Sequence, residues 1–261
     1  MDRACITALV FLLSVASLQA RLVAHWDFSD GDYADKAGSL NGTPVGTVSI
    51  VAVTETNVPF SKAVQTAASG LNANYLNIGN LGSLGIYTNS FTLSMWIKRD
   101  LPAGTTSPEF WESYSGASGA YEGIVGALRG AGSSDPGKAY ISVGGAGTAT
   151  SLLKGGVVAD GNWHWLVIRY DGDKDQLKYF EDGVHRIDRD VTRVASLTQL
   201  TARDCRIGDV FGGLVGDVRI YDTALSFTTD GSNNLTDGEL LQISIPVVRT
   251  FSLFVIGMAT P

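Results

Sequence analysis

Hydrophobic and polar residues alternate along short segments of the chain, and turns rich in glycine, asparagine, aspartate and serine separate these segments. In FTLSMWIK, residues 91–98, every second residue from Phe91 to Ile97 is apolar, and the residues between them are mostly polar. A period of two is typical of a β-strand with one buried face. Trp96 interrupts the polar positions, which indicates that the second face of this strand is not simply exposed to solvent.

The segment WHWLVIRY, residues 163–170, predicts a strand that is apolar on both faces. The first face would carry Trp163, Trp165 and Val167, and the second would carry Leu166, Ile168 and Tyr170. A strand of this kind is expected in the middle of a packed sheet. On this interpretation the tryptophans are structural anchors of the core rather than platforms for a sugar.

Further strands are predicted at residues 22–28, 49–53, 75–79, 122–128, 138–144, 177–181, 184–188, 205–210 and 213–222. Asp182-Gly183 is typical of a two-residue hairpin turn. Thr236 with Glu239 three residues later predicts the capped start of a short helix. The many short strands predict an all-β fold, a β-sandwich or barrel, in a single domain over residues 21–243. Residues 101–120 are expected to form a long loop.

Composition narrows the class of protein. The 31 glycines and a charged fraction of only 17% suit a β-protein with many turns. The net charge is −7 and no basic cluster occurs, so we expect no nucleic-acid partner. Of the two cysteines, Cys5 lies in the N-terminal apolar run, and Cys205 alone would form no internal disulfide.

The N-terminal segment, residues 1–20, predicts a signal peptide. Arg3 precedes about fifteen mostly apolar residues, which are too few for a membrane span of about 20, and Ala20 provides a small residue before a cleavage site. The alternative is a buried N-terminal strand. Export would place the protein outside the cell or at its surface.

The order of several motifs resembles a known family. They are LVAHWDF, DKAGSLNGT, NSFTLSMWIKRD, DGNWHWLVIRYDGDKDQLKYFEDGV, RIGDVFGGLVGDVRIYDTALS and LTDGELLQI. Together they are similar to the LamG-like, concanavalin A-like lectin/glucanase jelly-roll domain. This resemblance implies a two-sheet antiparallel jelly-roll sandwich. Two positions depart from the family pattern: Trp165 replaces a usual histidine, and Gly216 replaces the first of two adjacent acids, of which Asp217 is kept.

The C-terminal tail, residues 244–261, resembles a bacterial PEP-CTERM sorting segment. It contains IPVVRTF where that segment has IPEPRTF, and it ends without the usual basic cluster, so it resembles a truncated version. The alternative is a final edge strand. The resemblance implies a bacterial protein that contacts a membrane only through its signal or this tail.

The resemblance also implies one structural Ca²⁺. Asp35 in the early DKAG turn and Asp217 in the last core strand match positions that hold calcium in many domains of this kind, and hard oxygen ligands suit that ion. The alternative is that Asp35 caps a turn and Asp217 pairs with an arginine. The acidic run DGDKDQ, residues 171–176, lacks the glycine of an EF-hand loop, because Gln176 occupies that position.

The sequence predicts no enzyme. A glycosidase needs two carboxylates on either side of one bond, and no pair with suitable spacing is found, since neighbours such as Glu181 and Asp182 face opposite ways on a strand. A nucleophile elbow is also lacking. His164 is interpreted as a structural histidine, with a general base as the alternative.

Aromatic residues in and beside the predicted loop are candidate ligand-binding residues: Phe110, Trp111, Tyr114 and Tyr121. Their rings could stack on sugars, and the alternative is that they form a small core of their own. We therefore expect a non-catalytic exported module for recognition or adhesion, with a glycan or another surface protein as partner. A structural surface protein and a glycoside hydrolase are the alternatives.

Overall fold

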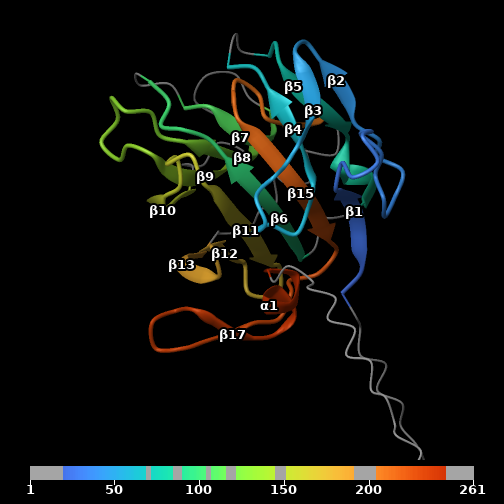
Figure 1. Ribbon diagram of the computed structural model, residues 1–261. Coiled ribbons are helices and arrows are strands. Elements are labelled where there is room, and N and C mark those ends of the chain that lie inside the picture. The colour runs from blue at the N-terminus through green and yellow to red at the C-terminus, as the bar shows by residue number, and fades with distance from the viewer. Residues whose placement is uncertain are drawn as a thin grey trace, which may run out of the picture.

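The computed structural model describes residues 20–68, 72–84, 90–103, 107–115, 122–144, 151–190 and 204–244. The predicted signal segment, except Ala20, and the predicted tail beyond Ser244 lie outside these ranges. The described chain is a sandwich of two antiparallel sheets, as the sequence predicts (Figure 1). No described helix has the length and apolar character needed to cross a membrane.

The larger sheet, called sheet A, has β15 near its centre, where β4 pairs with the first residues of that strand and β1 pairs with its last residues. Its strands, in spatial order, are β13 (Val184–Asp190), β12 (Gln176–Glu181), β11 (Trp163–Asp171), β6 (Phe91–Lys98), β15 (Leu214–Tyr221), β4 (Lys62–Thr66) and β3 (Val48–Ala52), with β1 (Leu22–Trp26) also on β15.

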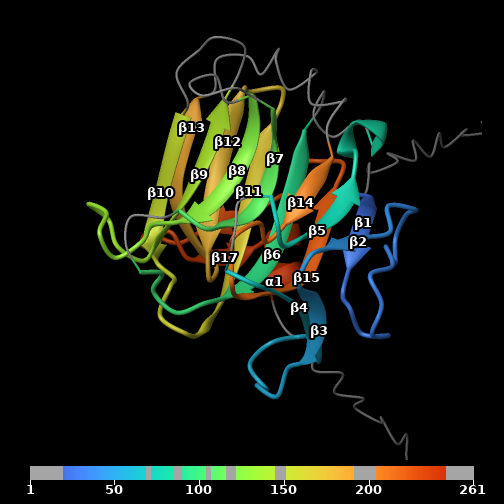
Figure 2. The ribbon, with the colours of Figure 1, turned by 90° about the horizontal axis from the view of Figure 1, so that it is seen from above.

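The second sheet, sheet B, covers one face of sheet A. Its strands, in spatial order, are β10 (Ser151–Val157), β9 (Lys138–Gly144), β8 (Glu122–Leu128), β7 (Glu109–Ser115), β14 (Cys205–Ile207), β5 (Tyr75–Gly79) and β2 (Thr43–Val45). A 3₁₀ turn, η1 (Leu81–Leu84), follows β5. At one side of the sandwich β10 lies beside β13 and β12 of sheet A (Figure 2).

The main core fills the space between the sheets. The alternation predicted for residues 91–98 is confirmed, because Phe91, Leu93, Met95 and Ile97 all belong to this core. The two faces predicted for residues 163–170 are also confirmed. The first-face residues belong to a second cluster on the outer side of sheet A, and the second-face residues belong to the main core. As expected, β11 is interior to the sheet, between β12 and β6.

The outer face of sheet A is covered by the segment that follows β15. This C-terminal cover, residues 222–244, contains the small hairpin of β16 (Thr228–Thr229) and β17 (Leu235–Asp237), and then helix α1 (Glu239–Ser244). Figure 1 shows β17 and α1 together on one side of the molecule, near β12 and β13. Leu235 and Leu240 of the cover pack with Trp96 and Trp165 in the second cluster.

The start of α1 differs from the prediction. Thr236 lies in β17, and its hydroxyl contacts that of Thr228 at 3.0 Å. Ser226 caps the helix instead, because its Oγ accepts the Glu239 N–H at 3.2 Å and donates to Glu239 Oε2 at 3.0 Å. Gly238 has a φ of 99°, which separates Thr236 from the helix that it was expected to cap.

Candidate ligand-binding site

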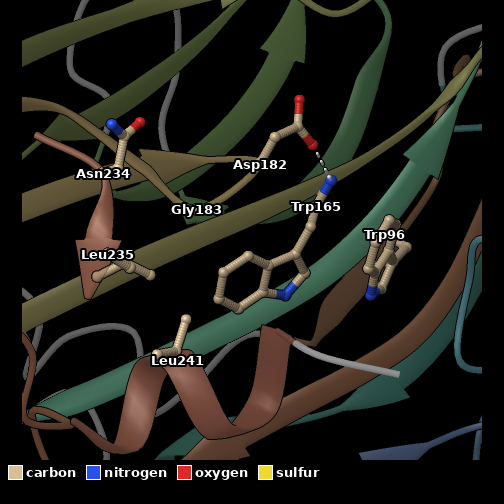
Figure 3. A pocket seen from close by; sticks show the side chains of 7 residues that line it. All are labelled: Trp96, Trp165, Asp182, Gly183, Asn234, Leu235 and Leu241. Atoms are coloured by element: carbon tan, nitrogen blue, oxygen red, sulfur yellow. Dashed lines mark hydrogen bonds between the residues drawn. The ribbon is translucent and has the colours of Figure 1, made fainter. Parts of the chain in front are cut away.

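A pocket of about 320 Å³ lies between sheet A and the C-terminal cover. Small-molecule sites usually measure about 300–1,000 Å³, so this pocket suits a ligand of one ring or a small number of rings. Figure 3 shows the side chains that line it: Trp96, Trp165, Asp182, Gly183, Asn234, Leu235 and Leu241. The sheet, the β12–β13 hairpin and the cover each contribute to the wall.

Two tryptophans on adjacent strands form the sheet side of the pocket. Trp96 of β6 lies directly opposite Trp165 of β11 in the antiparallel register. Their exposed fractions are 8% and 2%, so only small parts of the two rings reach the pocket. The buried Nε1 of Trp96 has no hydrogen-bond partner in the described chain. A buried N–H donor without an acceptor is costly.

The hairpin between β12 and β13 places a carboxylate at the rim. Asp182 and Gly183 have φ values of 50° and 77°, which confirms the predicted two-residue turn. Asp182 Oδ1 accepts the Trp165 N–H at 2.8 Å. Its Oδ2 lies 2.7 Å from His164 Nδ1, so the position of the carboxylate is fixed from two sides.

His164 connects this carboxylate to a second one. Its Nε2 lies 3.0 Å from Asp160 Oδ1, and its Nδ1 bonds Asp182. Burial opposes a charged ring, but the hydrogen bonds and charges of the two carboxylates outweigh that effect and raise the pKa of His164 to about 9. The same contact lowers the pKa of Asp160 to about 2. The geometry is that of the predicted structural histidine, whose two ring nitrogens are both engaged.

The raised pKa of His164 predicts a loss of stability at alkaline pH. Because the folded chain retains a proton that the unfolded chain loses near pH 6.5, the contribution is complete below about pH 6.5 and disappears as the pH rises through about 9. We expect this contribution to be roughly 1–3 kcal/mol. Urea unfolding at several pH values should show a smaller alkaline decline in His164→Gln, and equal declines in both proteins would contradict the assignment.

The cover closes the other side of the pocket. Leu235 N donates to the Gly183 carbonyl at 2.7 Å, which ties the cover to the hairpin. Asn234 is oriented by Asp230, whose two carboxylate oxygens accept its backbone N–H and its side-chain Nδ2, each at 2.9 Å. Since Nδ2 is engaged by Asp230, Asn234 offers the pocket its amide oxygen, which Figure 3 shows on the side facing Asp182.

The two aspartates of the predicted calcium site are both buried and lie on either side of His25. Asp35 Oδ1 accepts the N–H groups of His25, Ala37 and Gly38, and its Oδ2 accepts that of Leu40. Asp217 Oδ1 lies 2.7 Å from His25 Nε2, and Asp217 Oδ2 lies 2.9 Å from Arg219 Nη2.

This arrangement is the alternative in which Asp35 caps a turn and Asp217 pairs with an arginine. No group of at least three acidic, histidine or cysteine side chains in the described residues could hold a metal ion. Calcium binding stays a prediction, and the donors around these two carboxylates do not fit an oxygen cage. At Gly216 a Cβ would lie 2.5 Å from the Phe60 ring, which explains why the usual acid does not fit there.

The predicted aromatic loop is corrected by the structure. Residues 109–115 form strand β7, and Phe110 and Trp111 are 0% and 1% exposed in the main core. Rings that are fully packed between the sheets offer no face to a sugar, so the assignment of these two residues to a ligand site was wrong. Tyr114 lies within β7, and Tyr121 lies outside the described residues.

A cluster of acidic residues on sheet B, made of Glu109, Glu112 and Asp209 with Arg206, was not predicted from the sequence. A β-bulge between Glu109 and Trp111 breaks the alternation of β7. Burial, followed by the charges of Glu112 and Asp209, raises the pKa of Glu109. Burial also raises the pKa of Glu112, although Arg206, whose Nη1 lies 3.4 Å from Glu112 Oε2, opposes this shift. Both glutamates are shifted in the same direction, whereas a glycosidase separates an acid from an ionised partner.

The pocket was missed because its walls come from distant parts of the chain. Trp96 gave one signal, since it interrupts the polar face of its strand, and Asp182-Gly183 gave another as a turn. Asn234 and Leu241 reach the same place only because the cover folds back over sheet A. No pattern along the sequence links them to the tryptophans.

Structural comparison shows similarity to several binding domains. Botulinum neurotoxin type C, whose uptake into cells depends on interaction with two ganglioside molecules, is 11% identical with a TM-score of 0.58, over 79% of this chain and 49% of that one. The binding domain of Paraclostridial Mosquitocidal Protein 1 is 13% identical with a TM-score of 0.60, over 79% and 50% of the two chains. The present chain thus spans about half the length of these two structures.

A third similar structure is domain 4 of AbnA, a GH43 extracellular arabinanase from Geobacillus stearothermophilus, in complex with arabinotriose. It is 20% identical with a TM-score of 0.54, and the match covers 79% of this chain and 95% of that domain. At such identities the likeness establishes the fold alone. A search of curated protein sequences found no match.

The family is established at the level of sequence. Residues 70–228 match the family Laminin_G_3, described as the concanavalin A-like lectin/glucanases superfamily. This region covers more than half of the chain and includes the central strands β6, β11 and β15. The chain therefore belongs to the concanavalin A-like lectin/glucanases superfamily.

Proposed function

We propose that this protein is a non-catalytic, exported recognition module that binds a sugar in the pocket between sheet A and the C-terminal cover. One observation carries the proposal: two tryptophans on adjacent strands line a pocket whose other lining residues include a carboxylate, Asp182, and an amide, Asn234. The proposed location outside the cell or at its surface is supported by the N-terminal sequence.

The chemistry of the pocket suits a sugar ring. The C–H groups of a pyranose or furanose ring can pack on indole rings and on the leucines of the cover, Leu235 and Leu241. Ring hydroxyls can donate to Asp182 and to the amide oxygen of Asn234. Pockets that are mostly apolar with a few fixed polar groups are typical of small-molecule sites.

The similar structures support the same class of ligand. Domain 4 of AbnA is described with arabinotriose, and the botulinum neurotoxin with gangliosides, which are glycan-bearing lipids. The AbnA structure is domain 4 of an arabinanase, and 95% of that domain matches this chain. Recognition without catalysis agrees with the positions of Glu181 and Asp182, because only Asp182 lines the pocket and Glu181 is fully buried.

Two matched tryptophan variants test the proposal. Trp96→Phe removes the unpaired N–H and part of one ring in the pocket, and we expect it to weaken binding by about 5- to 30-fold. Trp163→Phe is the control, because Trp163 is buried in the same cluster with an unpartnered Nε1 but does not line the pocket. It should leave the Kd within about twofold, as expected of a residue that does not touch the ligand.

The measurement is binding to an array of neutral and acidic oligosaccharides, with the Kd of each positive ligand determined by calorimetry. Thermal unfolding of both variants checks that they are folded. If the wild-type protein binds no glycan on the array, the proposed function fails. If the two variants weaken binding equally, the sugar site lies elsewhere.

A further inference from the structure

The pocket carries a single sign of charge. Asp182 is the only charged residue among the seven that line it, and no lysine or arginine is among them. The nearest cationic group in its hydrogen-bond network is His164, which is held between Asp182 and Asp160 at 2.7 and 3.0 Å. On the cover, Asp230 supports Asn234 with a further carboxylate. A ligand in this pocket would therefore meet negative charge without a free positive partner.

The side-chain oxygens that line the pocket are hydrogen-bond acceptors. Asp182 and the amide oxygen of Asn234 can only accept hydrogen bonds. A hydroxyl group can donate, so the hydroxyls of a sugar can satisfy both groups. A carboxylate or a sulfate on the ligand only accepts, and beside Asp182 it would place two anions together in a partly desolvated site.

We propose that the pocket selects neutral sugars over anionic ones, and that Asp182 is the residue that determines this specificity. This inference rests on the proposed sugar-binding function and adds the class of sugar. Discrimination of this kind requires a group that repels the wrong ligand as well as groups that attract the right one. Asp182 does both, because it accepts hydroxyl hydrogens and repels uronic, sialic and sulfated residues.

The substitution that tests this is Asp182→Asn. Asparagine tolerates the left-handed backbone that Asp182 adopts at φ 50°, and its side-chain oxygen can still accept the Trp165 N–H. The variant therefore removes the charge and keeps the turn, but it also weakens the contact of 2.7 Å between Asp182 Oδ2 and His164 Nδ1. Asp173→Asn is the matched control, since Asp173 is an exposed residue of the β11–β12 turn and its replacement changes the net charge of the protein equally.

The probes are pairs of sugars that differ only at C6, which carries a hydroxymethyl group in one member and a carboxylate in the other: galactose and galacturonate, glucose and glucuronate, and mannose and mannuronate, each as the monomer and as the tetramer. For the pair that contains the strongest neutral ligand, we expect the wild-type protein to bind the neutral member at least tenfold more tightly. Asp182→Asn should reduce this ratio at least threefold by improving the affinity for the uronate, and Asp173→Asn should leave the ratio unchanged.

The outcomes separate this inference from the proposed function. If neither member of any pair binds, the sugar-binding function fails and the inference fails with it. If sugars bind but the uronates bind as tightly as the neutral sugars, the inference is overturned while the function remains. It is also overturned if both asparagine variants change the ratio equally, because the effect would then come from net charge rather than from Asp182.

Discussion

Replacing Trp111 by alanine is expected to lower the free energy of unfolding by about 3–5 kcal/mol. The ring lies in the core between the sheets with 1% exposure, and its Nε1 donates to Ser113 Oγ at 3.3 Å. Removal of the ring would leave a cavity and take the Nε1 donor from Ser113, whose hydroxyl also donates to the Ile124 carbonyl of the next strand. Urea unfolding followed by circular dichroism measures the change.

The same variant separates a core residue from a ligand-binding one. At a temperature where Trp111→Ala remains folded, it should bind sugar as tightly as the wild-type protein, because Trp111 does not line the pocket. Val157→Ala is a suitable control for stability, since Val157 is 56% exposed and its truncation should change the free energy by less than about 0.5 kcal/mol. If Trp111→Ala is folded but has lost sugar binding, Trp111 belongs to the ligand site and its assignment to the core alone is contradicted.

The wrong assignment of Trp111 shows which strands the sequence pattern can predict and which it cannot. Strands with regular alternation, such as β6, or with two apolar faces, such as β11, could be predicted together with the faces that they bury. In β7 the bulge places Phe110 and Trp111, which are neighbours in sequence, in the same core. A period of two does not survive a bulge, and the segment therefore resembled a loop.

The candidate site was less predictable than the fold, for a similar physical reason. Local chemistry fixes a turn such as Asp182-Gly183, because left-handed backbone favours a small set of residues. The partners of Asp217 were harder to predict, because Arg219 and His25 both bind a carboxylate that the family resemblance assigns to calcium. A pocket that requires the C-terminal cover to pack on Trp96 depends on tertiary contacts, which no local pattern records.

The second large effect is expected at Glu181, where Glu181→Ala should lower the free energy of unfolding by about 3–5 kcal/mol. This glutamate is 0% exposed at the end of β12 in sheet A. Its Oε2 accepts the Gly156 N–H of β10 in sheet B at 2.6 Å and bonds Arg186 Nε at 2.9 Å. Its Oε1 accepts the Tyr179 hydroxyl at 2.9 Å. Without the carboxylate, these donors would lose their partner where β10 meets sheet A.

The approach of β10 to Glu181 also requires glycine at position 155. A Cβ there would lie 1.7 Å from Glu181 Oε1 and 2.7 Å from Tyr179 Cε1, so Gly155→Ala should be destabilising by several kcal/mol, on the order of other overpacked sites. Gly231→Ala is the control, because a Cβ at Gly231 meets no atom within 4 Å. Chemical denaturation of Glu181→Ala, Gly155→Ala and Gly231→Ala allows their free energies of unfolding to be compared.

A double-mutant cycle then tests whether the two effects have a common origin. If Gly155 is needed because of the Glu181 side chain, Gly155→Ala should cost less in the Glu181→Ala background than in the wild-type protein, although the contact with Tyr179 would retain part of the penalty. Additive losses would show that the two residues act independently. In that case the Glu181 carboxylate would not hold β10 against sheet A, and the position of β10 would depend on backbone pairing and packing alone.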